Sequence, residues 1–308
     1  MTEDKNEIGG KMTSIRNILD SSSEGIVLCN SKGEITYFNP KGSEMIKKLT
    51  GYTISSGDLF NYIVPEFARE SFNIYFQNAV EGKPCETERI VKTGNDESIR
   101  YLVKYFPVLD GEGKNSYVCI SAKDITEEKH LKDVVNLHRE ISEKLPGFNT
   151  IESALKFILD LAIDKTGMDS GGIYLRNEDT DSFELKVIQG VSENFAGNTK
   201  VVKKGDKKWD SIMNGEQIIK QHWEYESNPD DILLKENLKL VVATPIKFRD
   251  EVLLSINIAS HTLDYFPEKS NDLLGIIKLE SITAIQNLLT EEKLKQALKK
   301  ISESENSK

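Results

Sequence analysis

The chain has 308 residues, of which 38% are hydrophobic and 29% are charged. This length favours two domains, each large enough to bury its own core. Acidic residues number 50 against 40 basic ones, and the resulting net charge of -10 would repel a nucleic-acid backbone. No apolar run approaches the roughly 20 residues that span a bilayer, and the N-terminus lacks the pattern of a secretory signal. We therefore expect a cytoplasmic protein without nucleic-acid or membrane partners.

The three cysteines, Cys29, Cys85 and Cys119, lie in alternating apolar segments and show no CxxC spacing. This pattern favours buried, reduced thiols over a disulfide framework or a zinc site. We expect neither a disulfide nor a bound metal ion.

Residues 1–12 are polar, and the pattern that follows them predicts a first α+β domain over residues 13–126. A turn at Gly33 separates two apolar segments and predicts a β-hairpin over residues 25–40, whose Asn39 can cap the next helix. The remaining elements of this domain are helices at 41–49 and 65–80 and strands at 85–93, 98–109 and 116–124, with turn residues Gly94 and Asn95 after the first of these strands.

The segments GIV (25–27), ITYFN (35–39), GY (51–52) and DIT (124–126) carry a resemblance to PAS domains that extends over residues 13–126. The resemblance implies a sensory domain whose interior could hold a small organic ligand. The candidate pocket residues are aromatic and fit a packed core equally well. They are Phe60, Phe72, Tyr75 and Phe76.

The first domain contains no histidine and lacks the Asn-Cys-Arg-Phe string of flavin photoreceptors. These absences disfavour His-ligated haem and a flavin adduct. Asp124 and Thr126 are expected to join the last strand to the next helix through side chain to backbone hydrogen bonds, and so to relay a signal.

Residues 127–148 predict a helical linker between the domains. The linker carries a stripe with spacings of three and four, as in a coiled coil, which predicts the seam of a homodimer. The alternative is that the stripe packs on the domain that follows. The seam consists of Leu131, Val134, His138, Ile141 and Leu145.

A second domain is predicted over residues 149–290, followed by a C-terminal helix and polar tail over residues 291–308. Four segments carry a resemblance to GAF domains: VATPI (242–246), RDE (249–251), LLSIN (253–257) and YF (265–266).

The GAF resemblance implies a second sensory pocket, although its candidate residues also fit a core whose polar groups are satisfied. The domain contains no cysteine, which excludes a thioether-linked bilin, and it lacks most of the residues that bind cyclic nucleotides in relatives. The sequence leaves any cofactor unknown. The candidates are Tyr174, Trp209, His222 and Trp223.

Together these patterns predict an α+β protein of two domains, each a central antiparallel sheet flanked by helices, joined by a helical linker. The order resembles the sensory input region of two-component sensor histidine kinases. We expect a module without catalytic residues that detects a small-molecule or redox cue. Dimeric helices would relay the cue to a kinase or another output domain.

Two alternatives remain open. His138 or His222 could accept a phosphate, the second within an HWE string, although no ATP-binding motif follows either histidine. A dimerisation scaffold without a ligand would use the helices alone.

Overall fold

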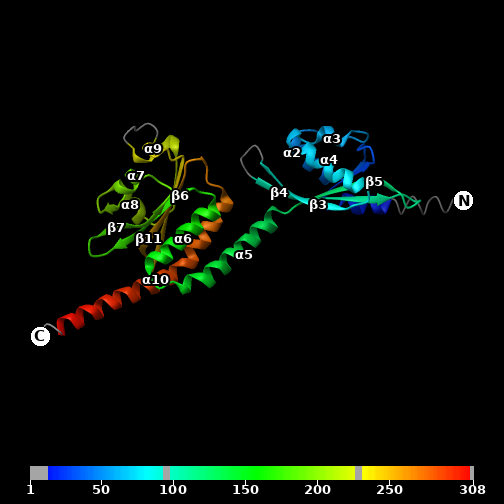
Figure 1. Ribbon diagram of the computed structural model, residues 1–308. Coiled ribbons are helices and arrows are strands. Elements are labelled where there is room, and N and C mark those ends of the chain that lie inside the picture. Colours follow the sequence, from blue (N-terminus) through cyan, green and yellow to red (C-terminus); the bar gives the residue numbers. More distant parts are fainter. Residues whose placement is uncertain (1–12, 93–97, 226–230, 306–308) are drawn as a thin grey trace. The chain divides into compact units, whose positions relative to one another are not determined.

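The computed structural model describes residues 13–92, 98–225 and 231–305 (Figure 1). The polar segment 1–12, the turn at Gly94 and Asn95 and the last three residues of the tail lie outside the described residues. The chain forms two compact units, Met1–Lys129 and His130–Lys308. Each unit has its own sheet, so the predicted class, α+β with two domains, is confirmed.

The N-terminal unit is built on a five-stranded antiparallel sheet with the strand order β2-β1-β5-β4-β3. Its strands are β1 (Gly25–Asn30), β2 (Ile35–Phe38), β3 (Cys85–Lys92), β4 (Ser98–Leu109) and β5 (Asn115–Asp124). Its helices are α2 (Pro40–Thr50), α3 (Phe60–Ile63) and α4 (Glu66–Val80), preceded by helical residues 13–20. Because α2, α3 and α4 cover the same face of the sheet, that face carries the core of the unit (Figure 1).

Asn39 organises the start of the N-terminal unit. Its Oδ1 atom accepts hydrogen bonds from the backbone N–H groups of Ile26 and Gly42, both at 2.8 Å, and the second of these caps α2 as predicted. Its Nδ2 atom donates to the carbonyl groups of Leu19 and Glu24, both at 2.9 Å. One fully buried amide therefore joins the first helix, β1 and α2.

Two glycines allow α2 to lie directly on β1. A Cβ atom on Gly42 would lie 2.8 Å from the carbonyl oxygen of Ile26, and one on Gly25 would lie 2.7 Å from the sulfur of Met45. The contact at Gly42 is with backbone and leaves no room for a side chain there, so α2 is held against the sheet at this point.

The C-terminal unit contains a six-stranded antiparallel sheet with the order β8-β7-β6-β11-β10-β9. Its strands are β6 (Ser170–Asn177), β7 (Ser182–Gln189), β8 (Val201–Lys203), β9 (Ile218–Gln221), β10 (Leu240–Phe248) and β11 (Glu251–Ser260). Its helices are α6 (Ile151–Thr166), α7 (Glu193–Asn198), α8 (Lys207–Met213), α9 (Ile232–Lys235) and α10 (Glu268–Glu305), together with most of α5 (Thr126–Lys144). Helices α5, α6 and α10 share one core with the sheet.

The stripe on α5 faces the core of its own unit. Ile141 and Leu145 are each 2% exposed and pack with α6 and α10, and Val134 lies against the same core. The prediction that these residues form an intermolecular seam is therefore wrong, and the alternative that they pack on the following domain holds. Spacings of three and four are the same for both kinds of contact. Of the predicted seam, only Leu131 (56% exposed) and His138 project outward.

Helices α5 and α10 run parallel to each other. His130 Nε2 lies 3.3 Å from Asp272 Oδ2, and His138 Nδ1 lies 3.0 Å from Glu280 Oε1. The second contact lies eight residues after the first on both helices, from 130 to 138 on α5 and from 272 to 280 on α10. The two helices therefore run in the same direction and keep the same residue offset between the two contacts.

Helix α10 is long and apolar enough, by length and composition, to cross a membrane. Its Leu274, Ile277 and Ile285 are nevertheless fully buried in the core of the C-terminal unit. Because a helix buried in a protein core can have the same length and apolar composition, α10 is weak evidence for a membrane span.

The sequence patterns missed several short elements. Strand β8 and helices α7 and α9 have between three and six residues, too few to show a period. The segment His222–Glu224 forms a turn of 3₁₀ helix after β9.

Candidate functional site

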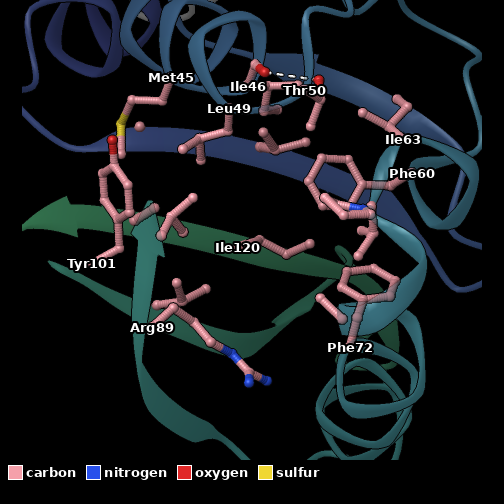
Figure 2. Close-up of a pocket in the computed structure, with 18 of the residues that line it drawn as sticks. Met45, Ile46, Leu49, Thr50, Phe60, Ile63, Phe72, Arg89, Tyr101 and Ile120 are labelled. Atoms are coloured by element: carbon pink, nitrogen blue, oxygen red, sulfur yellow. Dashed lines mark hydrogen bonds between the residues drawn. The ribbon is translucent and has the colours of Figure 1, made fainter. Parts of the chain in front are cut away.

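A cavity of about 850 Å³ lies in the N-terminal unit between the sheet and the helices (Figure 2). Helix α2 contributes Met45, Ile46 and Leu49, while Phe60 of α3 and Phe72 of α4 line the same space. A cavity with mostly apolar walls and a few polar groups is the usual form of a small-molecule site.

Strand β3 forms the edge of the sheet and brings a cation to this cavity. Its residues alternate, so that Arg89 and Val91 are half-buried on the inner face while Glu88 and Ile90 are exposed on the outer face. Arg89 pairs across the ladder with Tyr101 of β4. Arg89 is the one positively charged residue among the described residues that line the cavity.

Two tyrosines also belong to the cavity wall. Tyr105 is 5% exposed, and burial raises its pKa to about 12 despite the opposing effect of Arg89. Tyr101 is 4% exposed, and burial, followed by Asp124 and Glu44, raises its pKa as well. Both phenols are therefore protonated donors at neutral pH, and neither has a hydrogen-bond partner within the described part of the chain.

The predicted pocket residues of the N-terminal unit divide into two pairs. Phe60 and Phe72 line the cavity, with their ring centroids 5.4 Å apart. Phe76 stacks on Phe72 from behind, and Tyr75 stacks on Tyr105 at 5.6 Å. Tyr75 and Phe76 therefore support the wall and do not line it.

The exit of the N-terminal unit is fixed by the side chains predicted there. Asp124 Oδ1 accepts a hydrogen bond from the N–H of Thr126 at 2.9 Å. Thr126 Oγ1 accepts one from the N–H of Arg100 on β4 at 2.8 Å, and the N–H of buried Ile125 donates to the Arg100 carbonyl at 2.8 Å. The start of α5 is thus tied to β4.

A second tie joins α5 to the edge strand. Glu88 Oε1 lies 2.6 Å from Lys129 Nζ. Glu88 precedes the cavity residue Arg89, and successive strand residues face opposite sides. A displacement of β3 at the cavity would therefore reach α5 through one residue.

The C-terminal unit holds a smaller cavity of about 480 Å³, lined by the sheet and by α7, α8 and α9. The lining includes Tyr174, whose hydroxyl donates to the Thr199 carbonyl at 2.8 Å and accepts from Lys208 Nζ at 3.0 Å. The ammonium group of Lys208 lies 4.2 Å from the centre of the Tyr174 ring. This cation is already engaged within the chain.

The other three residues predicted for that pocket do not line it. Trp209 packs on Phe183 in the core, with ring centroids 5.0 Å apart. His222 and Trp223 lie in the turn after β9, where the centroids of their rings are 5.3 Å apart.

The cysteine thiols lie apart from one another. Cys29 pairs with Val118 across the β1–β5 ladder, and Cys119 pairs with Leu28. Because successive strand residues face opposite sides, Cys29 and Cys119 lie on opposite faces of the sheet. Burial raises the pKa of Cys29 to about 12 and that of Cys119 to about 11, so both remain protonated and poorly reactive.

Sequence reasoning missed Arg89, Tyr101 and Tyr105 as cavity residues. A signal for Arg89 was present, because alternation in CETERIVKT places it on the face of Val91. No group of three or more potential metal ligands occurs among the residues that the structure describes.

The comparisons with known proteins agree with this architecture. Residues 19–130 match the model of a family described as the PAS fold. No curated protein matches the chain. The match covers the N-terminal unit, including its cavity.

Two solved structures are similar to parts of this chain at TM-scores below 0.5. A GAF domain of a phosphoenolpyruvate-protein phosphotransferase from Coxiella burnetii is 16% identical, with a TM-score of 0.44 and coverage of 53% of this chain and 96% of that one. The chromophore-binding domain of an unusual bacteriophytochrome from R. palustris is 9% identical, with a TM-score of 0.42 and coverage of 87% and 95%. Identities this low bear on the fold alone. The match to the PAS fold bears out the predicted PAS-like domain in the N-terminal unit, and the chain is similar to a solved GAF domain over 53% of its length.

Proposed function

We propose that this chain is a signal-sensing module whose N-terminal cavity binds a small, largely apolar molecule and whose helix α5 relays the binding event. The observation that carries the proposal is the cavity of about 850 Å³, whose walls are mostly apolar and which contains protonated phenols and one cation. Its edge strand also contacts α5 through Glu88 and Lys129.

The relay would use the two ties between the sheet and α5. Both Thr126 and Lys129 hold the first turn of α5 to strands that line the cavity. A ligand that moves β3 or β4 would change the position of this turn, and a ligand can shift an equilibrium only through such differential contacts. Asp124 and Thr126 keep their proposed relay role on this basis.

A small molecule is favoured over a redox cue as the signal. A dithiol switch would require two thiols that can approach each other, and Cys29 and Cys119 lie on opposite faces of the sheet. Their raised pKa values also disfavour attack by a thiolate at neutral pH.

Binding of the neutral apolar dye Nile red, followed by fluorescence, tests the cavity. Leu49 lines the cavity, so Leu49→Trp should fill part of it and lower the affinity for the dye at least severalfold. Tyr62, which is exposed and outside the lining, provides the control Tyr62→Ala. A dye that does not bind, or that binds equally to both variants, would refute the proposed site.

Hydrogen exchange of the α5 amides, measured with and without the dye, tests the relay. We expect the dye to change exchange over residues 126–137 in the wild type. Glu88→Gln should reduce this change when the variant and the wild type are compared at equal dye occupancy, a condition that is needed because Glu88 also belongs to the cavity lining. Unchanged exchange on binding would remove the relay from the proposal.

A homodimer, a kinase or other output domain and a cytoplasmic location complete the proposal. With Ile141 and Leu145 buried, α5 retains Leu131 and Val135 as exposed apolar residues for a dimer contact. Light scattering should give about twice the chain mass of 34.8 kDa.

The competing assignment, a phosphate acceptor at His138 or His222, predicts autophosphorylation with ATP that is lost on His→Gln.

A further inference from the structure

The polar groups of the N-terminal cavity are unevenly distributed along it. Figure 2 shows Tyr101 extending toward Met45, whereas the Arg89 side chain extends the other way, toward the side occupied by Phe72. Tyr101 is subject to the negative charges of Asp124 and Glu44. The end of the cavity near Phe72 therefore carries the positive charge of Arg89.

Arg89 lacks a carboxylate partner in the described part of the chain. Its guanidinium carbon lies 5.6 Å from the centre of the Tyr75 ring, a cation–π contact that leaves the N–H donors open. Glu88, the other charged residue of the lining, has its carboxylate 2.6 Å from Lys129 on the outer face. No neighbouring side chain among the described residues therefore neutralises the positive charge of Arg89.

A second donor lies close to this cation. Tyr75 packs beneath Arg89 and also stacks on Tyr105, with 5.6 Å between the two tyrosine rings. Arg89 is close enough to Tyr105 to favour its ionised form electrostatically, although burial keeps the phenol protonated. Arg89 and Tyr105 thus both contact Tyr75, and Tyr105 also contacts Phe72, so the cation and the phenol belong to the same end of the cavity lining.

We infer that the ligand is an apolar acid, whose carboxylate is bound by Arg89 and Tyr105 and whose hydrocarbon body lies among Ile46, Leu49 and Phe72. Arg binds carboxylates with paired, charge-assisted hydrogen bonds. One cation and one neutral donor suit a single negative charge, and Ile46, Leu49 and Phe72 offer apolar contacts to the body. This inference deepens the proposed function and rests on it.

Displacement of Nile red by decanoate and by 1-decanol, two probes with the same chain length and different head groups, tests the inference. Decanoate should bind the wild type about 10- to 100-fold more tightly than 1-decanol, the range expected for hydrogen bonds to a charged group. Arg89→Gln should remove this preference and leave 1-decanol binding unchanged. The matched control, Arg100→Gln, removes the same charge outside the lining and should keep the preference.

Tyr105→Phe provides a second variant, because it deletes only the hydroxyl from a packed ring. It should weaken decanoate about 3- to 10-fold and leave 1-decanol unaffected. If Nile red fails to bind, the proposed function itself is wrong. If Nile red binds but the two probes displace it equally, or neither does, or Arg89→Gln and Tyr105→Phe retain the preference for decanoate, the inference is wrong and the proposed function stands.

Discussion

At the scale of single residues, Asn39 shows how one side chain can define a fold. An asparagine amide both accepts and donates, and the buried Asn39 uses both capacities toward four backbone groups. Only the carboxamides of Asn and Gln have this combination of donors and acceptors, and Gln is one methylene longer. Its position at the end of β2 explains why a strand, a helix and the preceding segment meet there.

Asn39→Ala should destabilise the N-terminal unit by about 2 to 4 kcal/mol, because buried backbone groups lose their partners. Asn39→Asp keeps the acceptor for Ile26 and Gly42 but cannot donate to Leu19 and Glu24, so it should also destabilise the unit. Urea denaturation measures both effects. Stability equal to the wild type in both variants would contradict the role of the amide.

The buried thiol of Cys29 makes a prediction about alkaline pH. Burial raises its pKa from the ordinary value of 9.0 to about 12. Between these values the folded state binds more protons than the unfolded state, so stability falls as pH rises and is unaffected below pH 9. Urea midpoints at pH 8 and pH 10 should differ less in Cys29→Ala than in the wild type. If the urea midpoint fell equally from pH 8 to pH 10 in the wild type and in Cys29→Ala, the Cys29 thiol would make no contribution to the pH dependence of stability.

At the scale of elements, α5 shows why a helical stripe does not identify its partner. The stripe of Ile141 and Leu145 fits a coiled coil and fits a domain core, and only the positions of α6 and α10 decide between them. The same helix presents exposed Leu131 in its first half. Helix α5 is therefore a surface element at its start and a core element at its end.

Ile141→Ala should lower the stability of the C-terminal unit by about 2 to 5 kcal/mol, as for other buried aliphatic residues truncated to alanine. Leu131→Ala, on the same helix but exposed, should change stability by less than about 0.5 kcal/mol. Circular dichroism during urea titration compares the two. If Ile141→Ala instead dissociated a dimer and left the unfolding midpoint unchanged, the packing of α5 within its own unit would be contradicted.

Much of this architecture could be predicted from sequence, because alternation and spacings of three and four set strands and helices before any tertiary contact forms. Gly33 and Asn39 mark the first hairpin and helix correctly for the same local reason. The ligand-binding residues are different. Arg89 and Tyr105 lie in ordinary strand positions 16 residues apart, and their proximity depends on the β3–β4 register and on the packing of Tyr75.

At the scale of the whole molecule, the two units have separate hydrophobic cores. Phe72 and Ile120 belong to one core, and Leu155 and Ile256 belong to the other. Stability is then a property of each unit, and a ligand that binds one folded unit stabilises that unit first.

Thermal unfolding should therefore show two transitions. Asn39→Ala should lower one of them and Ile141→Ala the other, and decanoate should raise only the transition that Asn39→Ala lowers. Differential scanning calorimetry of the full chain resolves the assignment. A single transition that both variants shift equally would mean that the two units unfold as one.

The parallel run of α5 and α10 has a mechanical consequence. If α10 slipped by about one turn, roughly 5.4 Å, the two imidazoles that now face carboxylates would face Ile276 and Ala284, four residues further along. Both contacts share one spacing, so neither could persist without the other. The two His–carboxylate contacts would therefore form or break together when α10 slides along its axis, so the helix pair would respond in one step and not gradually.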